Sequence, residues 1–100
     1  MRPPPTCTIT GSFEQGKRPV QGLVRFTPER LWVIQEGIAW AVLAPEVVLE
    51  ADGSFVVAVT PTNVDPVPWR YLVETPAGSF KIAVAMNEMG HTLRELLQRG

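Results

Sequence analysis

Apolar and polar residues alternate with a period of two along most of this chain, and this pattern constrains the fold more than any other feature. From residue 6 to residue 13, threonine or serine occupies every second position, and the residues between them are apolar or glycine. A β-strand turns successive side chains to opposite faces of its sheet, so such a segment is typical of a half-buried strand. The same character recurs at residues 20–27, 54–60, 69–75 and 80–86.

Two apolar runs between these segments do not alternate cleanly. Residues 31–34 and 38–43 are separated by Gln35, Glu36 and Gly37, which predicts a hairpin with Gly37 at positive φ. Two interpretations stay open for these runs. Either both of their faces are buried within the fold, or a partner covers one of them.

The next hairpin is predicted from residues 46–50 and 54–60. With Gly53 in the left-handed conformation, a three-residue loop at positions 51–53 pairs apolar residues with apolar residues across the two strands. This register pairs Leu49 with Phe55 and Val47 with Val57.

The last hairpin is predicted from residues 69–75 and 80–86, with residues 76–79 as its loop. Its register keeps apolar residues together on one face. The predicted pairs are Thr75 with Phe80, Val73 with Ile82, Tyr71 with Val84 and Trp69 with Met86. Between the two hairpins, three prolines within residues 61–68 predict an irregular connection that passes between sheets.

A short helix is predicted at the C-terminus, at about residues 92–99. Thr92 and Glu95 fit a capping box, and Leu93, Leu96 and Leu97 share one helical face. A helix of roughly two turns is marginal alone in water, so it needs a docking surface, either the rest of the fold or another chain. We therefore expect a proline-rich arm at residues 1–5 and a single domain at residues 6–100.

Together, roughly six to eight short strands separated by turn signals predict an all-β fold, a two-layer antiparallel β-sandwich with a short C-terminal helix. The net charge is −1 and the nine basic residues are spread along the chain, so no nucleic acid is expected as a partner. No apolar run approaches the ~20 residues that span a bilayer, so no membrane is expected either.

Few residues in this sequence suggest chemistry. His91 is the only histidine and Cys7 the only cysteine, and we expect a solvated histidine before the helix and a buried, inert thiol. Asp52 and Asp65 lie in turn contexts, and the glutamates are dispersed. The sequence therefore predicts no catalytic residue, no cofactor and no metal site, and hence a protein that is not an enzyme.

The three tryptophans are the more informative side chains, because exposed aromatic residues are favoured at binding surfaces. Trp69 alternates with Tyr71 and Val73, so we expect it in the core. Trp32 and Trp40 lie in the two runs that do not alternate. We expect core burial for them, with exposure at a protein or sugar interface as the alternative.

Several stretches of the sequence resemble a known class of module. They are Cys7 to Phe13, Pro19 to Pro28, Leu49 to Phe55, Pro61 to Pro66 and Trp69 to Glu74. Together they resemble the transthyretin-like or immunoglobulin-like β-sandwich modules of tailed-bacteriophage structural proteins, especially those of phages that infect actinobacteria. Such modules occur in minor tail proteins, in tail-fibre N-termini and in capsid decoration proteins.

This resemblance implies a virion structural protein that is assembled in the host cytoplasm and binds other virion proteins or copies of itself. It implies no catalytic residue. The residues expected at the partner interface are Trp32, Trp40, Leu93, Leu96 and Leu97. The alternative function is a carbohydrate-binding module that recognises a host-surface glycan by aromatic stacking.

Overall fold

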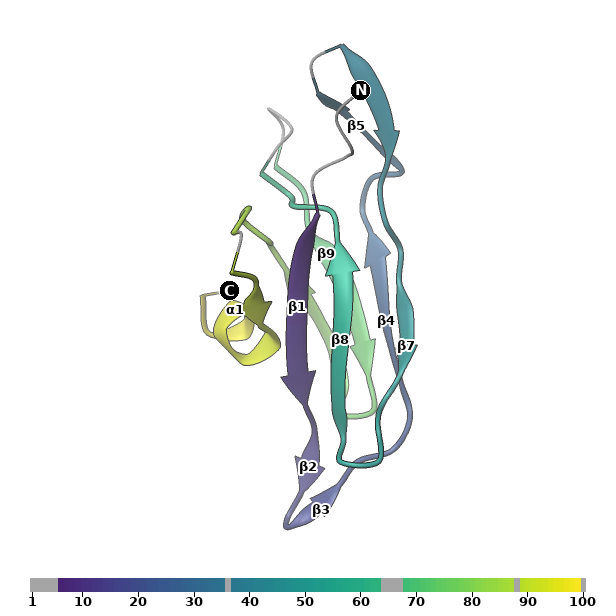
Figure 1. Cartoon of the computed structure of the whole chain (residues 1–100), viewed down its shortest axis with the longest axis vertical. Coiled ribbons are helices and arrows are strands. Elements are labelled where there is room, and N and C mark those ends of the chain that lie inside the picture. The colour runs from purple at the N-terminus through teal and green to yellow at the C-terminus, as the bar shows by residue number, and fades with distance from the viewer. Residues whose placement is uncertain (1–5, 36, 64–67, 88, 100) are drawn as a thin grey trace.

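The chain folds into two β-sheets that pack face to face, with one short helix along an open side (Figure 1). The computed structural model describes residues 6–35, 37–63, 68–87 and 89–99. The predicted all-β sandwich with a C-terminal helix is confirmed. The proline-rich arm predicted at residues 1–5 lies outside the described residues.

The first sheet has the strand order β11-β1-β8 and the second has the order β10-β9-β4-β7. In the first sheet the strands are β1 (Cys7–Ser12), β8 (Ser54–Val59) and β11 (His91–Thr92). In the second they are β4 (Leu23–Pro28), β7 (Glu46–Val48), β9 (Tyr71–Thr75) and β10 (Gly78–Ile82). All of these pairs are antiparallel except β1 with β11, which is parallel.

Two short ribbons extend the sandwich at opposite ends of its long axis (Figure 1). One ribbon joins β2 (Glu14–Gln15) to β3 (Arg18–Pro19), and the other joins β5 (Trp32–Gln35) to β6 (Ile38–Ala41). The β5–β6 hairpin forms as predicted, with Gly37 at a φ of 77°. Because it projects past the two sheets, only one of its faces meets the core.

The core lies between the two sheets and contains the residues that the alternating pattern turns inward. Phe26 packs edge-on against Tyr71, with ring centroids 6.1 Å apart, and Phe55 lies within 6.3 Å of Phe26 from the opposite sheet. Each of these side chains is almost completely buried. Trp69 also lies in the core, as predicted, and its ring is 5.1 Å from that of Tyr71.

The hairpin predicted at residues 46–60 is wrong in its pairing. Its three-residue turn forms, with Gly53 at a φ of 81° and the Glu50 N–H donating to the Ser54 carbonyl over 2.9 Å. Beyond the turn, however, β7 pairs with β4 and β8 pairs with β1, in different sheets. Leu49 and Phe55 are both buried, but they do not pair. Phe55 lies opposite Gly11 in the first sheet, and the Leu49 N–H, just after β7, donates to the Gly22 carbonyl.

The last hairpin forms, but its register differs from the prediction by two residues. Thr75 pairs with Gly78 and Tyr71 with Ile82, so the loop holds only Pro76 and Ala77. The Thr75 hydroxyl tightens this turn, because it accepts the Ala77 N–H and donates to the Gly78 carbonyl. A shift of two preserves the faces of both strands, so Val73, Ile82 and Val84 are buried as predicted. The predicted pair of Trp69 with Met86 does not form, because β10 ends at Ile82 and Met86 is exposed.

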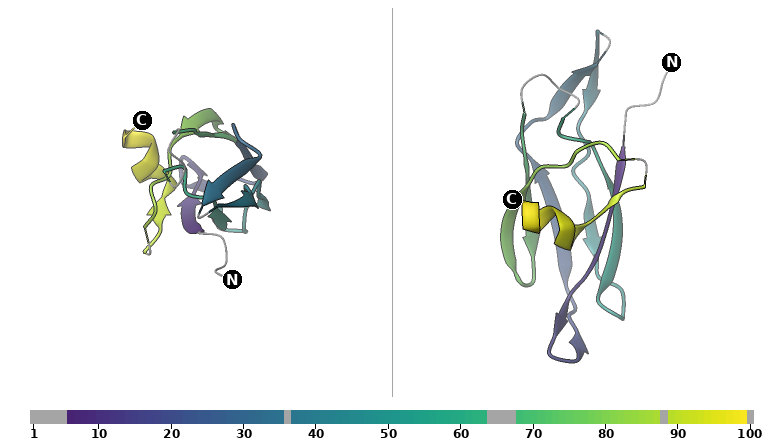
Figure 2. Two further views of the ribbon diagram at one scale, coloured as in Figure 1. Left: turned by 90° about the horizontal axis from the view of Figure 1, so that it is seen from above. Right: turned by 90° about the vertical axis from the view of Figure 1, so that its left-hand side faces the viewer.

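Helix α1 (Leu93–Arg99) docks on the sandwich itself, against β1, β11 and β10 (Figure 2). The Glu95 N–H donates to the Thr92 hydroxyl over 3.2 Å, so Thr92 is the N-cap, as predicted. Leu93 and Leu96 are buried against the sheets. Among the described residues, no helix is long and apolar enough to cross a membrane.

A buried tyrosine hydroxyl joins three separate segments at one end of the core. Tyr71 in β9 donates to the Leu43 carbonyl over 2.7 Å and accepts the Thr60 N–H over 3.0 Å. The Thr60 hydroxyl in turn accepts the Leu43 N–H over 3.0 Å. These bonds connect β9 to the segment after β6 and to the end of β8, and so tie the two sheets together.

We predict that Tyr71→Phe lowers the free energy of unfolding by about 1–3 kcal/mol, because the buried Thr60 N–H loses its acceptor. Urea unfolding followed by tryptophan fluorescence measures this change. Ser79→Ala, which removes an exposed hydroxyl from β10, is the control and is expected to change stability by less than about 0.5 kcal/mol. Equal stability of Tyr71→Phe and the natural chain contradicts the role given to the hydroxyl.

A second prediction concerns pH. Burial raises the pKa of Tyr71 above its ordinary value of 10.0, because the phenolate is poorly solvated in the core. Above about pH 10 the unfolded chain therefore loses this proton while the folded chain keeps it, and the free energy of unfolding falls as pH rises. Because Tyr71→Phe has no such proton, the stability difference between the two proteins is expected to shrink between about pH 9 and pH 11. A difference that stays constant in urea unfolding over this range contradicts the prediction.

Candidate functional site

The histidine and the cysteine both lie inside the fold, near the segment that precedes β11. His91 is only 6% exposed, so the predicted solvated histidine is wrong. Its strand pairs with β1, opposite Ile9, and this pairing carries the imidazole inward. Its Nε2 donates to the Ala85 carbonyl over 2.7 Å, and its Nδ1 lies 3.9 Å from the Glu95 carboxylate.

Cys7 is buried, as predicted, and its Sγ lies 3.5 Å from the Asn87 carbonyl. The thiol and the imidazole of His91 thus both bond to carbonyls of residues 85–87 and hold that segment against β1. Neither group is exposed to solvent. In the described part of the chain, their contacts are those of structural residues.

The acidic residues serve turns and surface ion pairs. Asp52 accepts both the hydroxyl of Ser54, over 2.5 Å, and its N–H, and these hydrogen bonds lower the pKa of the Asp52 carboxyl. The Glu46 carboxylate lies 2.7 Å from the Arg25 guanidinium on the outer face of the second sheet. Asp65 falls outside the described residues. Within the described ranges, no three His, Cys, Asp or Glu side chains gather as a metal site would require.

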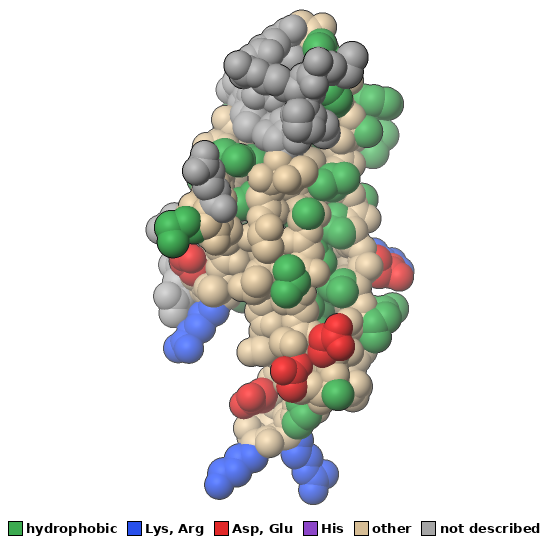
Figure 3. Space-filling model, in the orientation of Figure 1, with side chains coloured by type: hydrophobic (Ala, Val, Ile, Leu, Met, Phe, Trp, Pro, Cys, Tyr) green, Lys and Arg blue, Asp and Glu red, His purple; other side chains and the backbone are tan. Residues whose placement is uncertain are grey.

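An apolar surface stands out on the β5–β6 hairpin. Trp32 and Ile34 of β5 lie directly opposite Ala41 and Ala39 of β6, and all four are exposed. We call these four residues the ribbon face. Trp32 is 59% exposed and Ile34 is 63% exposed, and no charged residue belongs to this face. Figure 3 shows hydrophobic side chains at the upper right of the molecule, where Figure 1 places the β5–β6 hairpin.

The opposite side of the same hairpin is anchored in the sandwich. Val33 is completely buried, and Trp40, its partner across the two strands, is half-buried against the core. The hairpin is therefore held by one face and presents the other to solvent. The expectation of core burial is wrong for Trp32, because it alternates with Val33 and points away from the core.

The residues predicted to form one interface do not come together. Trp32 is exposed at the end of the sandwich, whereas Leu93 and Leu96 are covered by the sheets at its side (Figure 2). Leu97, also in α1, is only partly covered and is 37% exposed. Of the five predicted residues, Trp32 and Leu97 are thus the two with substantial exposed surface, and they lie on different parts of the molecule.

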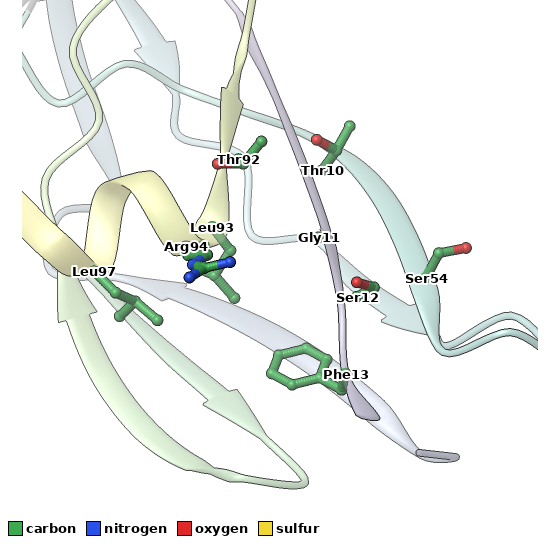
Figure 4. A pocket seen from close by; sticks show the side chains of 9 residues that line it. All are labelled: Thr10, Gly11, Ser12, Phe13, Ser54, Thr92, Leu93, Arg94 and Leu97. Atoms are coloured by element: carbon green, nitrogen blue, oxygen red, sulfur yellow. The ribbon is translucent and has the colours of Figure 1, made fainter. Parts of the chain in front are cut away.

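A groove between α1 and the end of β1 was not predicted from the sequence (Figure 4). It has a volume of about 780 Å³ and an apolar floor formed by Phe13, Leu93 and Leu97. Ser12 and Arg94 line its rim. We call this feature the β1 groove. The sequence marks Leu97 as part of an apolar helical face, but nothing in the local pattern brings Phe13 beside it.

Comparison of the chain with models of known protein families gives no match, and comparison with curated proteins gives none either. The surfaces described above are therefore the basis for a functional proposal.

We predict that the two sides of the β5–β6 hairpin differ in their effect on stability. Val33→Ala is expected to lower the free energy of unfolding by about 2 kcal/mol, because it removes buried methyl groups. Trp32→Thr and Ile34→Thr each place a β-branched residue with high strand propensity in the strand and are expected to change it by less than about 0.5 kcal/mol. Urea unfolding of the three variants checks this, and a large loss for Trp32→Thr contradicts the exposed placement.

Proposed function

We propose that this chain is a non-catalytic assembly module that docks on another protein through the ribbon face. The observation that carries this proposal is the exposure of Trp32 and Ile34 on a projecting hairpin whose other side is anchored by Val33. Burying apolar surface releases roughly 25 cal/mol per Å², so a partner that covers this face gains free energy directly.

The geometry of the hairpin favours a protein as the partner. A two-stranded ribbon is marginally stable in water, and this one extends beyond the sheets that support the rest of the fold. Its outer surface carries Trp32 and Ile34 on one strand and Ala41 and Ala39 opposite them on the other. An exposed tryptophan in an uncharged apolar patch is typical of a protein interface.

The resemblance to bacteriophage modules supplies the class of partner. In this proposal the chain is a virion structural protein, a minor tail, fibre-attachment or capsid decoration protein, and the ribbon face binds another virion protein or a further copy of the chain. Its place is then the virion, assembled in the host cytoplasm. The role proposed for the chain requires neither a cofactor nor catalysis.

A second candidate function is recognition of a host-surface glycan, which the exposed Trp32 ring favours because sugars stack on aromatic faces. Sugar hydroxyls also require hydrogen-bonding partners, and the neighbours of Trp32 on the ribbon face are Ile34 and Ala41. Since these side chains provide none, the protein-binding proposal is the better supported of the two.

We expect Trp32→Asp combined with Ile34→Asp to abolish incorporation of the protein into particles while leaving the isolated domain folded. The two carboxylates face solvent in the free protein but are buried without partners in the complex, which costs several kcal/mol. Incorporation is measured by mass spectrometry of purified particles, and folding by circular dichroism and thermal unfolding.

Val56→Asp is the matched control, because Val56 is 65% exposed on the outer face of β8, away from the hairpin. It is expected to be incorporated normally. Normal incorporation of the double variant contradicts docking through the ribbon face. Saturable binding of the natural chain on a glycan array, lost in Trp32→Thr, supports the glycan-binding candidate instead.

A further inference from the structure

The edge of β1 that faces β11 is paired in the first part of the strand and unpaired at its end. β11 pairs with β1 only at Ile9↔His91 and Thr10↔Thr92, and the chain then turns into α1. β1 itself continues to Ser12. In the described residues, the last two positions of β1 therefore have β8 on one side and no paired strand on the other.

The main chain of Ser12 points to this unpaired side. At the next residue, the Phe13 N–H donates to the Gly53 carbonyl and the Phe13 carbonyl accepts the Val20 N–H, so the Phe13 main chain faces the β8 side. Successive residues of a strand direct their main-chain groups to opposite edges. The Ser12 N–H and carbonyl are consequently aimed toward α1, where the β1 groove lies (Figure 4).

The β1 groove combines this strand edge with an apolar floor and one cation. Phe13, Leu93 and Leu97 provide the floor, and Arg94 stands on the rim (Figure 4). Arg94 makes no ion pair or side-chain hydrogen bond with the residues that the structure describes, and no Asp or Glu lines the groove. An occupant is favoured if it offers main-chain hydrogen bonds, apolar side chains and a carboxylate.

We propose that the β1 groove binds an extended segment of a partner polypeptide, which adds to β1 as a strand in line with β11. The segment's main chain pairs with Ser12, its alternate apolar side chains lie on Phe13 and Leu97, and an acidic side chain meets Arg94. Strand addition to an open sheet edge is a general mode of peptide recognition. This site is distinct from the ribbon face, which lies on a different part of the molecule, and the proposal does not depend on it.

The test uses the full chain, labelled with ¹⁵N, and two blocked probe peptides, Thr-Ile-Glu-Ile-Thr and Thr-Ile-Lys-Ile-Thr. The glutamate peptide is expected to shift the amide resonances of Ser12, Arg94 and Leu97 in a saturable manner. The lysine peptide is expected to bind at least about tenfold more weakly, because its charge repels Arg94. The proposal is wrong if the glutamate peptide shifts no amide resonances, or only those of residues outside the β1 groove.

Two variants separate the contributions. Arg94→Glu is expected to reverse the preference between the peptides, whereas Arg70→Glu, the same charge change at an exposed position that does not line the β1 groove, leaves it unchanged. Ser12→Pro removes the edge N–H and is expected to abolish binding of both peptides with little change in melting temperature, since proline is tolerated where an edge N–H is unpaired. If Ser12→Pro does not fold, the result with Arg94→Glu decides alone.

If Arg94→Glu prefers the glutamate peptide as strongly as the natural chain does, the role given to the Arg94 charge is wrong. A dimer that forms without peptide and disappears in Arg94→Glu places a second copy of the chain in the groove and overturns the assignment to a partner. The Trp32→Asp, Ile34→Asp double variant is expected to bind the glutamate peptide normally. Loss of particle assembly in this double variant therefore tests the ribbon face, and loss of peptide binding tests the β1 groove.

Discussion

A buried hydroxyl group, that of Tyr71, connects the two layers of this sandwich. Tyr71 lies in the second sheet, yet its hydroxyl accepts the N–H of Thr60 at the end of β8, in the first sheet, and donates to the carbonyl of Leu43. Its ring packs against Phe26 and Trp69 in the core. Leu43 lies two residues after β6, so these bonds also hold the chain where it leaves the β5–β6 hairpin.

How much of the fold followed from the sequence is best seen at Leu49 and Phe55. The period-two pattern correctly placed both side chains in the core, because it reports the face of a strand. It does not report the neighbouring strand, and a short turn between two apolar strands suits either a hairpin or a crossing between layers. For Tyr71 the pattern predicted the correct face of the strand but the wrong partner, Val84 instead of Ile82. The register differs by two residues because the Thr75 hydroxyl stabilises a shorter loop.

The candidate sites were harder to predict for a related reason. Trp32 lies in a run where apolar and polar residues do not alternate cleanly, so the sequence does not mark an outer face. Its exposure results from a hairpin that leaves the sheets, which is a tertiary feature. The burial of His91 depends on a pairing with Ile9 at the other end of the chain, and so does the groove between Phe13 and Leu97. Local sequence has no signal for contacts of this kind, although the N-cap at Thr92, a local feature, was predicted correctly.

The parallel pairing of β11 with β1 also has a consequence for the order in which the chain folds. The neighbouring contact between Cys7 and Asn87 joins residues 80 positions apart, so β1 meets β11 only after the roughly 80 residues between them have been made. Contacts of such long range close slowly, because a large loop must be ordered before they form. Until then β1 has an open edge along its whole length, and during synthesis this edge is prone to pair with another chain.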